Sequence, residues 1–194
     1  LIPLKLPEGK ELMPEEYFFD FLKKRKKLLD GVTITGGEPL LQQGLREFML
    51  KIKKDYNLLI KLDTNGSNAA KLKKLIEAEL IDYLAVDIKF SWDRYQELAP
   101  QGLAAEIKKS VDLIKKYDLN YEFRTTVVPG LHDQNEVEKI ASQINGADKY
   151  FIQNFRPVNT LDPELRNSRS FAPSELNNFK EIAEKYLNNV QIRD

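Results

Sequence analysis

The sequence predicts an α/β fold built on a parallel sheet, and two observations point to this class. Apolar, β-branched strand segments alternate with segments of helical period, and one such pair recurs about every 25 to 40 residues along 194 residues. No linker or low-complexity segment divides the chain, so we expect a single domain over residues 1–194. Repeated strand–helix units favour parallel strands joined by right-handed crossovers. The five internal strands leave a doubly wound sheet and a partial barrel open, and they are too few for a closed barrel of eight strands.

Two helices and two strands are predicted in the first third of the chain. Residues 14–29 form a helix with Pro14 in its first turn, where a proline is tolerated. The β-branched run at 32–35 is a strand that ends at two glycines. Residues 43–56 repeat apolar side chains at helical spacing, and the apolar run at 58–63 is the next strand.

The middle of the chain continues the same alternation. A helix is predicted over 69–80, because leucine and isoleucine recur there on one face. Residues 83–89 form a strand, residues 103–117 a helix, and residues 121–128 a strand that ends before Pro129 and Gly130.

The last third adds the final predicted elements. Residues 136–144 form a helix and residues 149–155 a strand. Residues 174–187 form a helix with Ser174 as N-cap after Pro173. Residues 190–193 form a short final strand.

Composition excludes several classes of function. The chain has 30 Lys plus Arg and 30 Asp plus Glu, so its zero net charge gives no electrostatic case for nucleic acid or an anionic membrane. No apolar run approaches the roughly 20 residues of a membrane span, and no secretory signal pattern opens the sequence, so we expect a cytoplasmic protein. Because cysteine is absent, these residues supply no disulfide, catalytic thiol or thiolate metal ligand. The single histidine, His132, is interpreted as a loop residue rather than a base.

Polar and glycine residues gather where the predicted strands end. They are Gly36, Gly37, Glu38, Asp63, Thr64, Asp87, Lys89, Arg124 and Asn154. Because the carboxyl ends of parallel strands meet at one edge of a sheet, we expect these residues to surround one site. Glu38 would complement an ammonium group, and Lys89 or Arg124 a carboxylate, so the set suits a zwitterionic ligand.

Structural interpretations remain open for individual members of this set. Asp87 and Lys89 are two residues apart on a predicted strand, so they share one face, either as a structural ion pair or as ligand contacts. Arg124 on a buried strand needs an anion, which is either a ligand or a carboxylate of the chain itself.

Four motifs in chain order resemble the radical S-adenosylmethionine enzymes. They are TITGGEPLLQ, LDTNG, YLAVDIK and RTTVVPGLHD. They are most similar to the branch that activates glycyl radical enzymes, which includes activators of pyruvate formate-lyase and of anaerobic ribonucleoside-triphosphate reductase. The stretch FIQNFRPVNTLDP is similar to the reductase activators. The resemblance implies a partial (βα)6 TIM-type barrel of the radical S-adenosylmethionine type.

The resemblance also implies a role for each candidate residue. Gly36, Gly37 and Glu38 would bind the methionine amino group of S-adenosylmethionine. Asp63, Thr64 and Asp87 would frame a monovalent cation. The remaining implied contacts to the cofactor's carboxylate, ribose and nucleoside are Lys89, Arg124, Thr126 and Asn154.

The implied activity is reductive cleavage of S-adenosylmethionine by a [4Fe-4S] cluster, which gives a 5′-deoxyadenosyl radical that generates a glycyl radical on a partner enzyme. A flavodoxin or ferredoxin would be the electron donor. The family holds its cluster with three cysteines that this sequence lacks, so the chain alone would be inactive. We expect the family's first strand and cluster loop to lie upstream of Leu1. The alternatives are a 7-carboxy-7-deazaguanine synthase-like radical enzyme and a cluster-free module that binds S-adenosylmethionine or a nucleotide.

Overall fold

Six parallel strands form one sheet in this computed structural model, which describes residues 13–158, 160 and 163–193. The strands are β1 (Gly31–Ile34), β2 (Leu59–Thr64), β3 (Tyr83–Asp87), β4 (Tyr121–Val127), β5 (Tyr150–Asn154) and β6 (Val190–Arg193). Their order in the sheet follows their order in the chain. Among the described residues, β1 pairs only with β2 and β6 only with β5, so the sheet is open. This confirms the partial barrel and excludes the doubly wound sheet, in which strand order reverses at a switch point.

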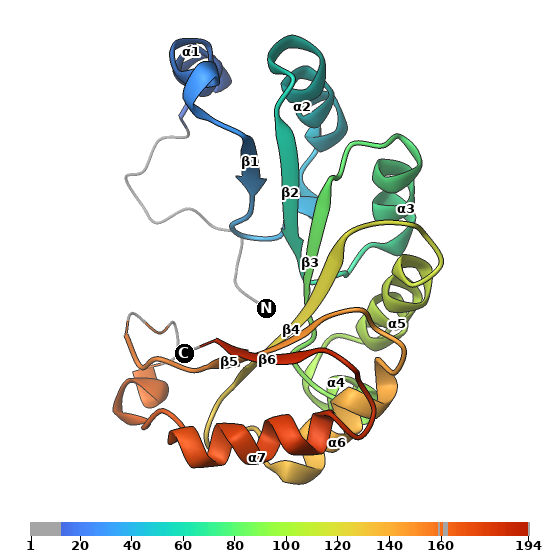
Figure 1. Ribbon diagram of the computed structural model, residues 1–194, viewed down its shortest axis with the longest axis vertical. Coiled ribbons are helices and arrows are strands. Elements are labelled where there is room, and N and C mark those ends of the chain that lie inside the picture. The colour runs from blue at the N-terminus through green and yellow to red at the C-terminus, as the bar shows by residue number, and fades with distance from the viewer. Residues whose placement is uncertain (1–12, 159, 161–162, 194) are drawn as a thin grey trace.

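Seven helices and several shorter turns accompany the strands in the described part of the chain. The helices are α1 (Glu15–Arg25), α2 (Leu45–Lys51), α3 (Ala69–Glu77), α4 (Trp92–Leu98), α5 (Leu103–Ile114), α6 (Gln134–Gln143) and α7 (Pro173–Ala183). Figure 1 shows them around the convex side of the curved sheet, which leaves the other side uncovered by helices. None of these helices has the length and apolar character that a bilayer span requires.

The core lies between the sheet and the helices because alternate residues of each strand point to opposite faces. Ile60 and Leu62 of β2 and Leu84 and Val86 of β3 are fully buried on the helix side. They share one core cluster with apolar residues of the helices, such as Val111 of α5.

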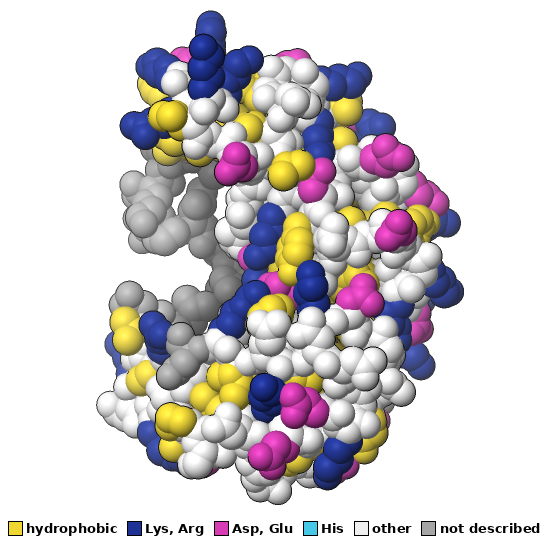
Figure 2. Space-filling model, in the orientation of Figure 1, with side chains coloured by type: hydrophobic (Ala, Val, Ile, Leu, Met, Phe, Trp, Pro, Cys, Tyr) yellow, Lys and Arg dark blue, Asp and Glu magenta, His cyan; other side chains and the backbone are white. Residues whose placement is uncertain are grey.

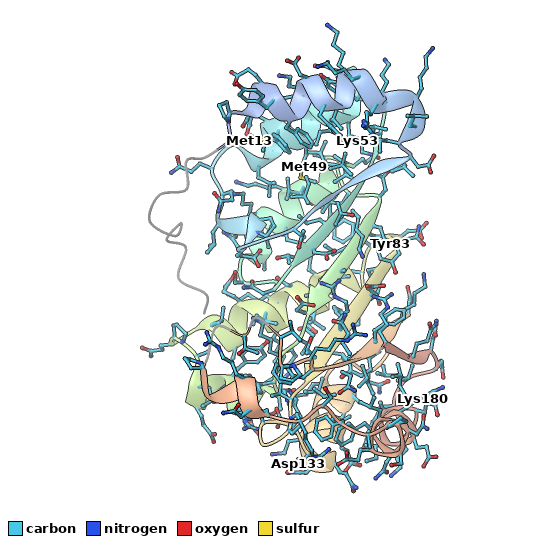
Figure 3. All side chains as sticks on the ribbon, turned by 90° about the vertical axis from the view of Figure 1, so that its left-hand side faces the viewer. Met13, Met49, Lys53, Tyr83, Asp133 and Lys180 are labelled. Atoms are coloured by element: carbon cyan, nitrogen blue, oxygen red, sulfur yellow. The ribbon has the colours of Figure 1, made fainter. Side chains whose placement is uncertain are left out.

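The opposite, concave face of the sheet is polar. Lysine and arginine side chains gather along this hollowed side in Figure 2. Figure 3 looks onto this face and labels Tyr83, the first residue of β3. The interior of a closed barrel is instead packed with aliphatic side chains.

Two predicted elements need correction, and one helix was not predicted. β3 ends at Asp87, so Lys89 lies beyond the strand rather than on it. The helix α4 follows and was not predicted, because seven residues without a clear apolar repeat give little periodic signal. α7 begins at Pro173 with Ala172 as N-cap, so Ser174 is not the cap. A proline fits the first helical turn since its φ is preset and its missing N–H needs no partner there. The opening stretch LIPLKLPEGKELMP contains prolines and is interpreted from the sequence as a loop that leads to the first helix, and its first twelve residues lie outside the described residues.

Candidate functional site

The loop after β1 is fixed to the loop after β2 by Glu38. Its Oε1 accepts hydrogen bonds from Leu40 N at 3.0 Å and from Thr64 Oγ1, and its Oε2 accepts one from Asn65 N at 2.8 Å. Gly36 and Gly37 precede it with φ values of 86° and 52°, in a region that glycine adopts without steric cost. The carboxylate is therefore buried and oriented by the chain itself before any ligand binds.

Arg124 is paired with two carboxylates of the concave face. Its Nε donates to Asp87 Oδ1 at 2.8 Å and its Nη1 to Asp63 Oδ2 at 3.1 Å. Burial would lower the pKa of Arg124, but the hydrogen bonds and charges of Asp87 and Asp63 outweigh it and raise this pKa. Between the two interpretations left open by the sequence, the structure supports a carboxylate of the chain as its anion.

The predicted cation cage is not preformed. The Arg124 guanidinium bridges the Asp63 and Asp87 carboxylates and neutralises the charge that would attract a cation. Thr64 points to the opposite face of β2, where its hydroxyl donates to Glu38 and accepts from Gly66 N at 3.1 Å. The monovalent cation therefore stays a prediction, and in this arrangement Arg124 would have to move to admit it.

A second charged cluster on the concave face centres on Glu122, which was not predicted from the sequence. Its side chain is 1% exposed and accepts two hydrogen bonds from Arg193, at 2.8 and 2.9 Å, and one from Tyr83 Oη at 2.7 Å. Burial raises the pKa of Tyr83 to about 12, aided by the hydrogen bond to Glu122. Burial alone would raise the pKa of Glu122, but the hydrogen bonds from Arg193 and Tyr83 lower it. The alternation Glu122–Phe123–Arg124 was the available signal, because it puts both charges on one face.

Lys89 differs from the other predicted residues because its ammonium group is free. Its backbone N–H donates to Tyr95 Oη at 2.7 Å and its carbonyl lies 2.8 Å from His132 Nε2. Within the part of the chain that the structure describes, its Nζ atom makes no hydrogen bond or ion pair. Lys89 is therefore the predicted site residue with a charge still available to a ligand.

Two adjoining cavities open at this rim and share Lys89 and Phe90 in their walls. The first, of about 170 Å³, has an apolar wall from α4 and α5 and a polar rim with Gly37, Glu38 and Asn65. Ser67 also lines it, and its Oγ is buried without a hydrogen-bond partner among the described residues. The second, of about 230 Å³, adds Asp87, Arg124 and Thr126. Each is below the roughly 300–1,000 Å³ of a typical small-molecule site, and together they reach its lower part.

The last two predicted residues have different surroundings. Thr126 is exposed in the second cavity, beside Gln153 of the neighbouring strand. Asn154 lies at the end of β5 and its side chain pairs with the backbone N–H and C=O of Phe171, both at 3.0 Å. It lines neither of the two cavities. The structure thus joins Gly37, Glu38, Asp87, Lys89, Arg124 and Thr126 around the shared rim and leaves Asn154 in a structural contact.

His132 is held by backbone groups at both ring nitrogens. Its Nδ1 accepts a hydrogen bond from Val128 N at 3.1 Å, and its Nε2 faces the Lys89 carbonyl. Burial lowers its pKa, against the opposing effect of the Lys89 carbonyl. A neutral ring with Nε2 protonated satisfies both contacts, so the interpretation of His132 as a structural loop residue fits this geometry.

The parallel sheet is open, its strands follow chain order, and its cavities lie at the carboxyl ends of the strands. These features define a partial-barrel α/β protein. Comparison with known proteins identifies the family. The sequence pattern of the radical SAM superfamily, where SAM denotes S-adenosylmethionine, matches residues 5–144, so the chain belongs to this superfamily.

Similar proteins place the chain more narrowly within the superfamily. A candidate glycyl-radical enzyme activating enzyme of Methanocaldococcus jannaschii is 36% identical over 186 residues, which cover 92% of this chain and 75% of the relative. A second such protein of that organism is 31% identical over 84% of this chain and 62% of its own length. In fold, a domain of pyruvate-formate lyase-activating enzyme from Bacteroides vulgatus matches with a TM-score of 0.65 at 18% identity, over 84% of this chain and 99% of that one.

The family implies S-adenosylmethionine and a [4Fe-4S] cluster, and the residues fit only the first. A glycine turn beside an oriented carboxylate, a free ammonium and two joined cavities match an adenosylated amino acid in chemistry. A cluster needs thiolates for most of its ligands, and the sequence has no cysteine. Among the described residues, no group of three or more acidic, histidine or cysteine side chains is placed to hold a metal ion.

Proposed function

We propose that this chain is the S-adenosylmethionine-binding part of an enzyme that generates a glycyl radical on a partner enzyme. The similar candidate activating enzymes support the class of reaction. Because these 194 residues contain no cysteine, the cluster thiolates would have to come from outside them. A glycyl radical enzyme would be the partner, and a flavodoxin or ferredoxin the source of electrons.

The observation that carries the proposal is that Lys89, whose ammonium is free, and Glu38, whose carboxylate is buried, line the wall of the same cavity. The two charges match the carboxylate and the ammonium of a bound amino acid, and a charge-assisted hydrogen bond is about twice as strong as a neutral one. The neighbouring cavity past Phe90 would take the nucleoside, with Thr126 in its wall. S-adenosylmethionine supplies a 5′-deoxyadenosyl radical when its sulfonium is reduced. The residues of this chain orient it and exclude water from it.

Lys89→Met tests the proposal by isothermal titration calorimetry with S-adenosylmethionine. We expect the wild-type chain to bind, and Lys89→Met to bind at least about tenfold more weakly, because a hydrogen bond to a charged group contributes roughly 1.5–3 kcal/mol. Lys108→Met is the matched control, since Lys108 is exposed on α5 and lines neither cavity. Its affinity should equal that of the wild type.

Adenosine, which lacks the methionine part, serves as the comparison ligand in the same titrations. Lys89→Met should leave adenosine binding unchanged. Wild-type binding of S-adenosylmethionine no tighter than that of adenosine would contradict the proposal and favour a nucleotide-binding module.

A further inference from the structure

The segment that follows β3 is held in place by side chains that come from α6. Glu136, in the first turn of α6, is 6% exposed, and its carboxylate accepts hydrogen bonds from Ser91 N at 2.7 Å and Ser91 Oγ at 2.9 Å. Ser91 is fully buried. One residue further along, Trp92 N donates to Gln143 Oε1 at 2.9 Å. These contacts join residues that are 45 and 51 positions apart in the chain.

His132 holds the same segment from the loop before α6. Its Nε2 meets the Lys89 carbonyl at 2.8 Å, and its ring stacks on Phe90 with centroids 5.3 Å apart and planes inclined by 10°. Successive residues from Lys89 to Trp92 are thus each bound by a residue of the segment 132–143. We call this set of contacts the α6 clamp.

The α6 clamp acts on the wall between the two cavities. Lys89 and Phe90 belong to both cavities, and the Lys89 ammonium has no partner of its own within the described chain. The position of that charge is therefore set by the backbone of residues 89–92 rather than by its side-chain contacts. A shift of this backbone would move both the Lys89 ammonium and the wall between the two cavities.

The buried carboxylate of Glu136 binds the segment before α4 rather than its own helix. Burying a carboxylate costs several kcal/mol unless strong hydrogen bonds offset it. The N-terminus of α6 does not need it, because Asp133 already caps this helix with a 2.8 Å hydrogen bond from Glu136 N. Both of the Glu136 side-chain hydrogen bonds go instead to the segment that carries Lys89.

We propose that Glu136 and His132 are positioning residues, which hold the Lys89–Trp92 backbone so that the Lys89 ammonium meets the carboxylate of the bound ligand. This inference rests on the proposed function, because it takes S-adenosylmethionine as that ligand. It adds a set of residues that do not touch the ligand but determine how tightly it binds.

Glu136→Gln tests the α6 clamp, with Glu138→Gln as the matched control. The first substitution keeps the size of the side chain but removes its charge and one of its two acceptors. Glu138 is on the same helix and also accepts one side-chain hydrogen bond, from Tyr186 Oη at 2.9 Å, away from the cavities. We expect amide hydrogen exchange at Ser91 to become about tenfold faster in Glu136→Gln and unchanged in Glu138→Gln, because a charge-assisted hydrogen bond is lost. Ser91→Ala, which removes only the Ser91 Oγ bond, gives a milder second variant.

Calorimetric titration with S-adenosylmethionine then separates positioning from general destabilisation. Glu136→Gln should weaken binding roughly three- to tenfold, as expected for one displaced charge contact. In a Lys89→Met background it should cause no further loss, because a residue that acts through Lys89 has nothing left to position.

Each outcome of the titrations decides a stated point. Equal affinity of wild type and Glu136→Gln, or an equal loss in both backgrounds, would overturn the inference and leave the proposed function standing. Absence of binding to the wild-type chain would overturn the proposed function and this inference together. Faster exchange at Ser91 would still show in that case that the α6 clamp holds the backbone, which distinguishes the two failures.

Discussion

Glu38 is bound by its own chain at both carboxylate oxygens, and this changes what its substitution should do. The hydrogen bonds from Leu40, Thr64 and Asn65 join two loops at the rim. We predict that Glu38→Gln weakens S-adenosylmethionine binding and also lowers the free energy of unfolding by roughly 1–3 kcal/mol, because the amide nitrogen cannot accept from Asn65 N. Urea unfolding and calorimetry measure the two effects.

Glu47→Gln, an exposed substitution on α2, is the control, and its free energy of unfolding should stay within about 0.5 kcal/mol of the wild type. Full wild-type stability of Glu38→Gln would contradict the observed network.

Glu122 gives a second test at the scale of one side chain. Glu122→Gln should lower the free energy of unfolding at pH 7 by about 2 kcal/mol, because it removes the charge that Arg193 and Tyr83 share. The folded pKa of Glu122 is lowered, so its contribution is present above its unfolded value near 4.5 and is lost as pH falls through the folded pKa. The difference between variant and wild type should therefore shrink below pH 4.5. A difference that stays constant from pH 7 to pH 3 would argue against the lowered pKa.

The sequence predicted where the candidate site residues lie better than it predicted which side chains they bind. Strand ends predicted that Glu38, Asp87, Lys89 and Arg124 meet at one rim, since parallel strands share a polarity. They did not predict that Arg124 binds both Asp63 and Asp87, because pairing depends on the register between strands, in which Asp87 lies beside Arg124. That register is a property of the assembled sheet.

At the scale of elements, periodicity identified the long helices and all six strands but missed α4. The segment Trp92–Leu98 is short, and its N-terminus is satisfied by Glu136 and Gln143 from another helix rather than by a local capping motif. The residues near α4 in the sequence therefore do not indicate that its N-terminus is capped by a side chain 45 residues away. For the same reason, nothing near His132 in the sequence indicated that its ring would bind the Lys89 carbonyl.

His132 makes the loop before α6 sensitive to pH. Burial lowers the folded pKa of His132 from 6.5, and the charge of Arg94 acts in the same direction. The hydrogen bond to the Lys89 carbonyl and the charge of Glu136 raise this pKa but do not outweigh burial. A lowered pKa means that the unfolded chain binds the proton more readily, so stability is full above pH 6.5 and declines as pH falls through the folded value. His132 is the sole histidine in the sequence, so this decline belongs to one group. We expect the free energy of unfolding of the wild type to fall as pH drops below about 6.5. In His132→Gln this decline should be absent, and an identical slope in both would refute the assignment.

At the scale of the whole molecule, the sheet is curved like a barrel wall but lined for contact with polar groups. Lys61, Tyr83, Glu122 and Arg193 occupy the concave face, where a closed barrel would place aliphatic layers. Lys61 and Lys149 both lie over the Tyr83 ring at 5.5 Å. Closing the sheet would bury these charges at a high cost, so the polar lining and the open edges at β1 and β6 agree with each other.

The absence of cysteine sets a limit on the whole chain that can be measured directly. We predict that anaerobic treatment of the 194-residue chain with ferrous iron, sulfide and thiol leaves no stoichiometric iron or acid-labile sulfide after desalting, because carboxylates and a buried neutral histidine do not replace thiolates. An apo-ferredoxin treated in the same buffer is the positive control. The treated chain should bind S-adenosylmethionine as the untreated chain does and release no 5′-deoxyadenosine when a reductant is added. Iron and sulfide retained in fixed ratio to the chain would require oxygen or nitrogen ligands that the described side chains do not bring together. Such a result would mean that this protein binds a cluster without the cysteine ligands that its family uses.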